Sequence, residues 1–190
     1  MYYHASQTAN IKVLEPRVSN HGTPLVYMST KRENVLVYLS IAIEKYCKET
    51  GDCHQGRWQK WGPYGFESDG TFRLEEYYPN ALVETYKGVS GYIYFAEKMN
   101  DPQENIQISN AVTSSEPVAI DGCEFVPDAY EAIMEAAEKG QIKILRYEDL
   151  SDKKLDWIKK TMKEEYKGAV LCPEYQYFLK AKFPFCTDEK

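Results

Sequence analysis

The sequence predicts an α+β fold in which strands precede a helical C-terminal part. Apolar segments of strand length, bounded by Gly, Pro, Asn or Asp, recur from the first residue to about Tyr147. After Ser151 the apolar residues recur at helical spacing instead. The length of 190 residues is typical of one domain or of one domain with an appendage. We therefore expect an α+β domain over residues 1–147 and a helical extension over 148–190 that packs on the same domain.

The first strands are predicted from short apolar runs that turn residues interrupt. Residues 1–6 form the first expected strand, and a second extended piece over 11–14 ends before Pro16, because proline cannot continue a strand ladder. The run Pro-Leu-Val-Tyr-Met at 24–28 follows a polar stretch and is predicted to be a buried strand.

The clearest helical pattern of the chain follows this strand. Thr30 and Glu33 match a capping box, in which a hydroxyl and a carboxylate satisfy the free amides at a helix start. Apolar residues then recur at helical spacing from Val35 to Cys47. Gly51 is a suitable helix stop. The pattern predicts one continuous helix from about residue 30 to residue 50.

A long loop is predicted over residues 52–70, beyond the usual two to six residues of such connections. Its part 56–66 contains two Trp, one Tyr and one Phe among glycines. Two interpretations stay open for this aromatic loop. It is either a lid or recognition surface for a ligand or acceptor, or a long loop that its aromatic side chains anchor to the core.

The elements after this loop follow from turn residues and periodicity. Asp121-Gly122 between two apolar runs is typical of the type I′ turn of a two-residue hairpin, and it places Glu124 near the start of the returning strand. Asp128 begins a helix that Gly140 ends. Further strands are expected over 71–78, 89–96 and 141–147, and further helices over 151–166 and 173–182.

Composition excludes several classes of function. The 23 Lys and Arg against 29 Asp and Glu give a net charge of −6, which disfavours nonspecific nucleic-acid binding. No apolar run approaches the roughly 20 residues of a membrane-spanning helix. None of the five cysteines forms a Cys-x-x-Cys pair, so we expect a reduced, cytoplasmic setting and no metal site. Sixteen tyrosines are more than one core needs, and we expect some of them to line a site.

Four residues stand out as candidates for chemistry. His4 lies in the first strand before the small residues Ala5 and Ser6, which let a flat ligand approach the backbone. Tyr27 ends a buried strand and Tyr38 lies in the adjacent helix, so the two rings are placed to face each other across a gap and hold an aromatic ligand.

Glu124 is a carboxylate among apolar neighbours on its strand. Burial of an unpaired carboxylate costs several kcal/mol, roughly, so it calls for a partner or a ligand. The ordinary interpretation is a solvent-facing residue on an edge strand, since Cys123 and Phe125 point to the other side.

The order of these motifs resembles the ADP-ribosyltransferases of the His-Tyr-Glu class, the group of the poly(ADP-ribose) polymerases and diphtheria toxin. The three matching segments are Tyr3-His4-Ala5-Ser6, Val26-Tyr27-Met28-Ser29-Thr30 with Tyr38, and Gly122-Cys123-Glu124-Phe125-Val126-Pro127-Asp128. The resemblance covers roughly residues 1–40 and 113–130. It implies split antiparallel β-sheets with flanking helices. The family usually has Gly after the His, where this chain has Ala5.

The resemblance also implies a substrate and roles. NAD would be the substrate. Its ADP-ribose would pass either to an unknown acceptor, such as a protein, or to water. His4 would bind the ribose 2′-hydroxyl of the nicotinamide nucleoside, and Tyr27 and Tyr38 would stack on the nicotinamide ring. The backbone of Ala5 and the hydroxyl of Ser6 or Ser29 would hold the carboxamide. Glu124 would orient the ribose and offset positive charge as the glycosidic bond opens.

Other interpretations remain beside this one. Lys31 and Arg32 are candidate contacts for a pyrophosphate, or simply a solvated helix end. RNA 2′-phosphotransferases share the fold, but the chain lacks the additional basic RNA-binding region that they need. In the main alternative, the domain keeps the fold as a non-catalytic binding module, with the aromatic loop 56–66 as its contact surface.

Overall fold

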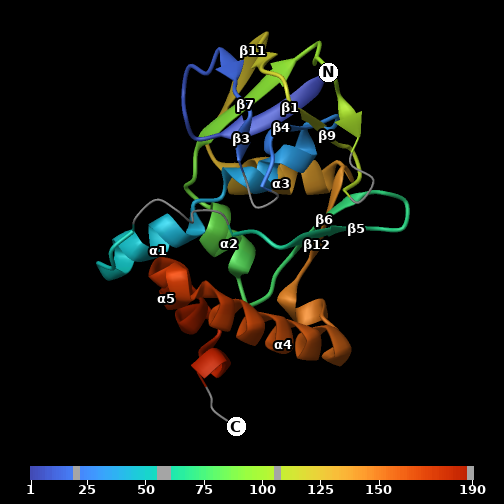
Figure 1. Ribbon diagram of the computed structural model, residues 1–190. Coiled ribbons are helices and arrows are strands. Elements are labelled where there is room, and N and C mark those ends of the chain that lie inside the picture. The colour runs from blue at the N-terminus through green and yellow to red at the C-terminus, as the bar shows by residue number, and fades with distance from the viewer. Residues whose placement is uncertain (19–21, 55–60, 105–107, 188–190) are drawn as a thin grey trace.

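The computed structural model describes residues 1–18, 22–54, 61–104 and 108–187. It confirms the α+β class: one half of the molecule is built on a large antiparallel sheet and the other half on helices (Figure 1). The N-terminus lies in the half with the large sheet, and the last described residues of the chain lie beside the helices at the opposite end (Figure 1).

The large sheet has seven strands in the order β11-β7-β1-β4-β9-β8, with β3 paired to β4. All of its pairings are antiparallel. The predicted first strand therefore lies near the centre of the sheet, between β7 and β4. The strands are β1 (Tyr2–Ser6), β3 (Arg17–Val18), β4 (Pro24–Ser29), β7 (Gly91–Ala96), β8 (Gln103–Glu104), β9 (Ala111–Ser114) and β11 (Gly122–Val126).

Two smaller sheets complete the β-structure. A three-stranded sheet has the order β12-β6-β5, with β5 at Tyr64–Phe66, β6 at Phe72–Glu75 and β12 at Ile142–Leu145. Its β5 lies inside the segment predicted to be a loop, so that prediction was wrong for these residues. A two-stranded sheet pairs β2 (Val13–Leu14) with β10 (Val118–Ala119).

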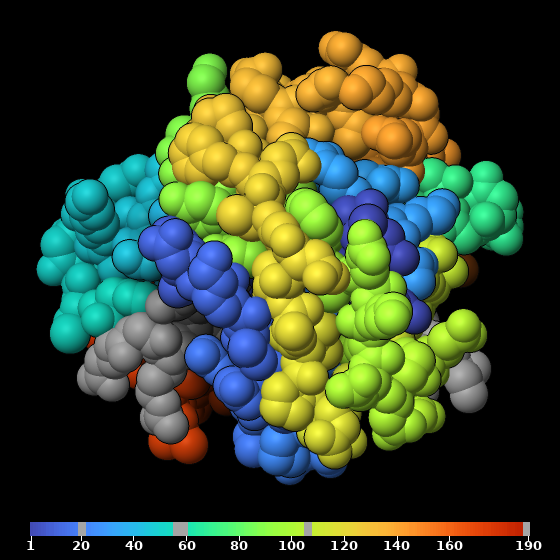
Figure 2. Space-filling model, turned by 90° about the horizontal axis from the view of Figure 1, so that it is seen from above, coloured from blue at the N-terminus to red at the C-terminus, as the bar shows by residue number. Residues whose placement is uncertain are grey.

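The predicted hairpin at Asp121-Gly122 is wrong. β10 pairs with β2 and β11 pairs with β7, so the two runs around the Asp-Gly are not partners. Gly122 does not have the positive φ of a type I′ turn. A Cβ atom at this position would collide with the ring of Phe95 on the neighbouring strand, so glycine is required here for close packing. The segment of β10 and β11, in yellow, crosses the centre of the molecule when it is viewed from above (Figure 2).

The helix predicted over 30–50 is interrupted. It consists of a 3₁₀ helix, η1 (Glu33–Leu39), and an α-helix, α1 (Ala42–Thr50). Between them Ser40 is extended, and its Oγ accepts hydrogen bonds from the amides of Ala42 and Trp61. Thr30 makes no capping hydrogen bond to η1, so the predicted capping box is wrong. The Ser40 side chain supplies the hydrogen-bond acceptor for backbone amides at this break between the two helices. Apolar periodicity alone does not reveal the break.

The C-terminal helices pack on helices from the first half of the chain. α4 (Asp152–Gly168) and α5 (Pro173–Lys182) share a hydrophobic cluster with α1 and α2 (Ala81–Tyr86). Trp61 is buried at its centre and packs against Phe178 at a centroid distance of 5.3 Å. Three short 3₁₀ helices lie nearby: η2 (Tyr147–Asp149), η3 (Ala169–Leu171) and η4 (Pro184–Thr187).

The helix α3 (Ala129–Glu138) follows β11 and begins at the predicted cap, Asp128. One carboxylate oxygen of Asp128 accepts hydrogen bonds from the amides of Tyr130 and Glu131, and the other accepts from Gly88. The helix ends before Gly140, whose φ of 68° is the left-handed conformation expected of a helix stop.

We expect Asp128→Ala to lower the free energy of unfolding by about 1 kcal/mol, because the first amides of α3 then lose their acceptor. Asp128→Asn is the matched control: it keeps the capping oxygen but places its amide nitrogen opposite the amide of Gly88, so it should lose less stability than Asp128→Ala. Urea unfolding of the three proteins measures both values. An equal loss for Asn and Ala would contradict the capping role.

Candidate functional site

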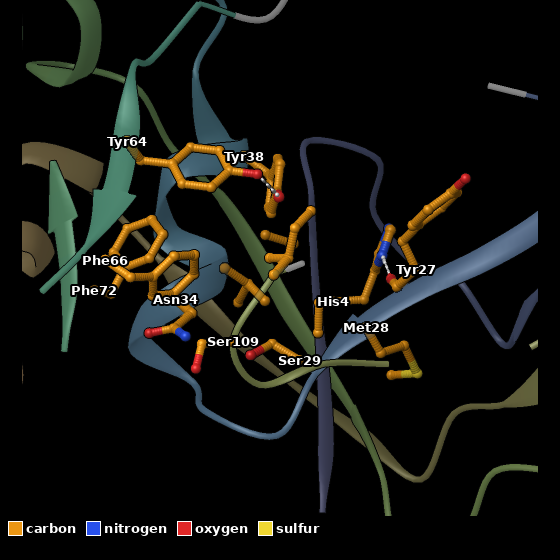
Figure 3. Close-up of a pocket in the computed structure, with 14 residues that line it drawn as sticks. His4, Tyr27, Met28, Ser29, Asn34, Tyr38, Tyr64, Phe66, Phe72 and Ser109 are labelled. Carbon is orange, nitrogen blue, oxygen red and sulfur yellow. Dashed lines mark hydrogen bonds between the residues drawn. The ribbon is translucent and has the colours of Figure 1, made fainter. Parts of the chain in front are cut away.

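A pocket lies where the large sheet and the three-stranded sheet face each other across η1. The space inside it and at its open mouth together amounts to about 640 Å³. Five residues singled out from the sequence line it: His4, Ala5, Tyr27, Ser29 and Tyr38. These five residues lie on β1, β4 and η1. Residues of β5 and β6, together with others of η1, line the other side of the pocket (Figure 3).

The pocket exists because β1 and β4 separate soon after they meet. Their only registered pair is Tyr3 with Ser29. Next to this pair, the imidazole Nδ1 of His4 is 2.9 Å from the backbone oxygen of Tyr27. A carbonyl oxygen only accepts, so Nδ1 is the nitrogen that carries the proton. The His4 side chain thus bridges the two strands where their backbone ladder stops.

The floor of the pocket offers backbone and hydroxyl groups to a ligand. Ala5 is 6% exposed, pairs with Ile93 of β7, and does not have a positive φ, so its backbone conformation does not require glycine. Ser29 is also buried, and its Oγ accepts a hydrogen bond from the amide of Lys31 at 3.1 Å. Because this bond uses the oxygen as acceptor, the hydroxyl hydrogen can be donated to a ligand.

The wall of the pocket is aromatic. The hydroxyls of Tyr38 and Tyr64 are 3.1 Å apart, and the Tyr64 and Phe72 rings lie at a centroid distance of 5.1 Å. Loss of water around its hydroxyl, with Tyr64 beside it, raises the pKa of Tyr38 above its ordinary value, so the phenol stays protonated at neutral pH. This wall was missed from the sequence, although Tyr64 and Phe66 lie within the aromatic loop.

The predicted pairing of Tyr27 with Tyr38 is not what the structure shows. The Tyr27 ring extends away from Tyr38, beyond His4, while Tyr38 contacts Tyr64 (Figure 3). Tyr38 and Tyr64 meet edge to face at 6.3 Å. The surface for an aromatic ligand is therefore made by Tyr38 and the small sheet, because β5 replaces the expected loop there.

Asn34 is a second lining residue that the sequence did not reveal. It lies on η1 among the buried residues Val35, Leu36 and Val37, and it is itself only 5% exposed. Its Oδ1 has no hydrogen-bond partner in the described structure. A buried acceptor without a partner costs about 1–3 kcal/mol. In the sequence, Asn34 directly follows the charged residues 31–33 and precedes an apolar run, a position that does not mark it as buried.

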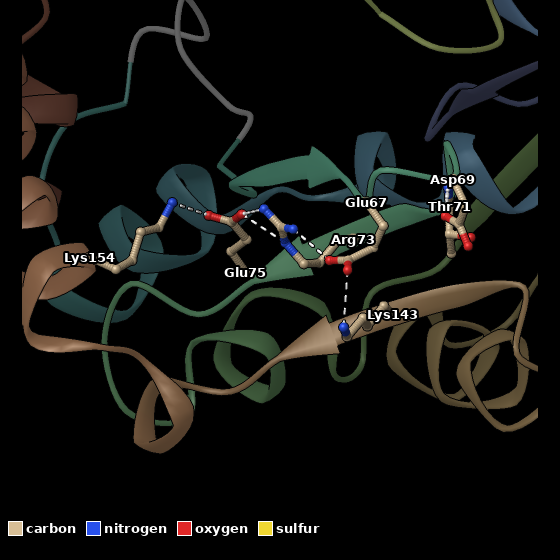
Figure 4. Close-up of polar contacts among 7 residues, drawn as sticks. All are labelled: Glu67, Asp69, Thr71, Arg73, Glu75, Lys143 and Lys154. Carbon is tan, nitrogen blue, oxygen red and sulfur yellow. Dashed lines mark hydrogen bonds and ion pairs between the residues drawn. The ribbon is translucent and has the colours of Figure 1, made fainter.

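The three-stranded sheet that carries the aromatic wall is tied to α4 by a chain of charges (Figure 4). Glu75 on β6, whose side chain is 3% exposed, forms ion pairs with Arg73 at 2.5 Å and with Lys154 of α4 at 2.7 Å. Arg73 also binds Glu67, which in turn pairs with Lys143 of β12 at 3.1 Å. These bonds connect the pocket wall to the helical half of the molecule.

Two of the predicted site residues, Ser6 and Glu124, do not line this pocket. The Oγ of Ser6 accepts a hydrogen bond from the amide of Thr8. Glu124 forms a two-bond ion pair with Arg32, at 2.8 Å and 2.5 Å. Register places Glu124 with Ile93 and Ala5 on one face of the sheet and His4 on the other. The two predicted catalytic side chains therefore leave the sheet on opposite faces.

The aromatic loop is described only in part. Residues 56–60 lie outside the described residues. Trp61 is 7% exposed in the helical cluster, and Tyr64 and Phe66 form part of the pocket wall. The described aromatic side chains thus point inward, as expected of a loop anchored to the core.

Within the described ranges, no group of three or more His, Cys, Asp or Glu side chains is placed to hold a metal ion. The described helices include none with the length and apolar character needed to cross a membrane. Comparison with protein-family models, with curated proteins and with solved structures finds no match for this chain.

Proposed function

We propose that this chain binds NAD through its nicotinamide group and transfers the ADP-ribose to an acceptor or to water. The observation that carries the proposal is the convergence of His4, Ala5, Tyr27, Ser29 and Tyr38, from separate segments of the chain, on one pocket. His4, Tyr27 and Tyr38 are three of the four residues on which the resemblance to the ADP-ribosyltransferases rests; the fourth, Glu124, does not line the pocket.

The chemistry of the pocket suits the nicotinamide end of NAD. Its pyridinium ring carries a positive charge, and the ring faces of aromatic side chains such as Tyr38, Tyr64 and Phe72 attract such a cation. The backbone of Ala5 and the hydroxyl of Ser29 can hold the carboxamide. His4 lines the same pocket, where its side chain bridges β1 and β4.

In this proposal Glu124 supplies negative charge to the transition state. Glycosidic bond cleavage passes through an oxocarbenium-like state, which a fixed anion favours over the ground state. The side chains of Glu124 and Arg32 are 48% and 35% exposed, so opening their ion pair costs about 1 kcal/mol or less. Glu124 shares the sheet face of Ala5, two strands away.

A second candidate is a module that binds NAD or a related ligand without turning it over. The pairing of Glu124 with Arg32 outside the pocket favours this candidate. The two candidates agree on ligand binding and differ only in catalysis, so binding and turnover have to be measured separately.

Thermal unfolding with NAD, nicotinamide and ADP-ribose tests the proposal. A ligand present at 100 times its Kd adds about 2.7 kcal/mol to the apparent stability, which we expect for NAD and nicotinamide. Tyr38→Ala should abolish most of this shift, because it removes the wall of the pocket. Tyr177→Ala, a similarly exposed tyrosine on α5, is the matched control and should leave the shift intact. No shift from any of the three ligands would overturn the proposal.

A further inference from the structure

The side-chain amide of Asn34 is the least explained polar group of the pocket. It is held at 5% exposure by the apolar turn of η1, and its Oδ1 has no partner among the described residues. Figure 3 shows Asn34 beside Phe72, with the hydroxyls of Ser109 and Ser29 next to it along the same side of the pocket. The Asn34 Oδ1 therefore lacks a hydrogen-bond donor, which a ligand can supply.

The pocket has no group to neutralise a negative charge. The described residues that line it include no Lys, Arg, Asp or Glu. The one basic side chain is His4, whose Nδ1 is already bonded to the backbone oxygen of Tyr27. A carboxylate that enters this apolar space loses its water without gaining a cation, which is unfavourable. An uncharged amide is not penalised in this way.

We propose that Asn34 selects ligands that carry an uncharged carboxamide and rejects the corresponding carboxylates. This inference rests on the proposed function, since it concerns the same pocket. The amide of Asn34 has one accepting and one donating end, and its last torsion is soft enough to turn either end toward a ligand. A ligand carboxamide matches both ends. A carboxylate has acceptors only, so it leaves Oδ1 without a donor and places an anion beside it.

Matched pairs of ligands test the selection: nicotinamide against nicotinate, and benzamide against benzoate. Their dissociation constants are measured by titration calorimetry for the wild type, Asn34→Leu and Asn34→Ala. We expect the wild type to prefer each amide at least tenfold. Both variants should bind the amides at least tenfold more weakly, with little change for the acids. Asn34→Leu keeps the branched shape of the side chain, and Asn34→Ala avoids overpacking if leucine does not fit.

The melting temperature of the ligand-free variants separates recognition from structure. Asn34→Leu removes an unpaired buried acceptor, so its melting temperature should not fall, whereas a structural amide would lower it when lost. Amide preference that persists in both variants would overturn the role of Asn34. If benzamide binds with this preference but NAD does not bind, the proposed function fails and the amide selection stands. If no amide binds to the wild type, both fail.

Discussion

Glu124→Gln is expected to slow NAD turnover by about 10²–10³-fold, the usual loss when one fixed electrostatic group is removed from a transition state. Glutamine keeps the length and shape of the side chain but loses the charge that offsets the oxocarbenium-like sugar. The side chain is about half exposed and its partner Arg32 is one-third exposed, so the melting temperature should hardly move. Release of nicotinamide from NAD measures the rate, and calorimetry measures NAD binding, which should persist.

Arg32→Gln is the matched control for this experiment. It breaks the same ion pair but leaves the carboxylate free, so turnover at saturating NAD should be retained. Unchanged turnover in Glu124→Gln would remove Glu124 from the chemistry. A wild type that binds NAD with no detectable turnover would favour the binding module instead.

Glu75→Gln is expected to lower the free energy of unfolding by about 3 kcal/mol. The carboxylate is buried and receives hydrogen bonds from Arg73 and Lys154. Removing one member of a buried charge pair leaves the others without compensation, which commonly costs about 3–5 kcal/mol. We expect the lower end of this range because the side chains of Arg73 and Lys154 are 24% and 28% exposed. Arg73 also keeps its ion pair with Glu67 in the variant. Urea unfolding at neutral pH measures the loss.

Lys143→Gln is the control for this charge chain. Its ammonium also pairs with Glu67, but the side chain is 56% exposed, so its removal should cost less than about 1 kcal/mol. Similar losses for both variants would contradict a special role for the buried carboxylate.

The effect of Glu75 should depend on pH in a definite direction. Burial alone would raise the pKa of Glu75, but the hydrogen bonds from Lys154 and Arg73 outweigh it and hold the pKa below its ordinary value. A lowered pKa in the folded state gives stability that is complete above the ordinary value of about 4.3 and is lost as pH falls through the folded pKa. The difference between wild type and Glu75→Gln should therefore shrink in acid.

Local signals predicted the C-terminal helices well. The second one was expected over 173–182, and α5 runs over Pro173–Lys182. The first begins after Ser151, whose hydroxyl caps it by accepting from the amide of Lys154. Proline at a helix start and serine at a cap act within one turn, so the sequence is sufficient to place them.

The two Asp-Gly pairs of the chain show where local signals fail. Asp121-Gly122 has the composition of a hairpin turn but makes none, because β11 pairs with the distant β7. Asp69-Gly70 lies in the real hairpin between β5 and β6, with Gly70 at a φ of 81° and its amide bonded to the Glu67 oxygen. The choice between them depends on long-range strand pairing, which dipeptide composition does not record.

The residues of the candidate site also differ in whether local sequence signals predict them. His4, Ala5, Ser29 and Tyr38 could be predicted because their motifs are short and ordered along the chain. Tyr64 and Phe72 were not predicted: Tyr64 lies on β5, which was expected to be a loop, and Phe72 lies on β6, whose parallel partner β12 follows it by a long interval. Asn34 has no motif at all, and only its burial without a partner identifies it.

The parallel pairing of β6 with β12 has a consequence for synthesis of the chain. Phe72 and Leu74 pair with Ile142 and Ile144, so the aromatic wall has no completed support until β12 has left the ribosome. β1 is synthesised first, and both its sheet partner β7 and the supporting strand β12 follow it along the chain. The described residues that line the pocket all lie at or before Ala111, whereas β12 begins at Ile142, so a chain truncated before β12 contains the pocket residues without the strand that supports the aromatic wall.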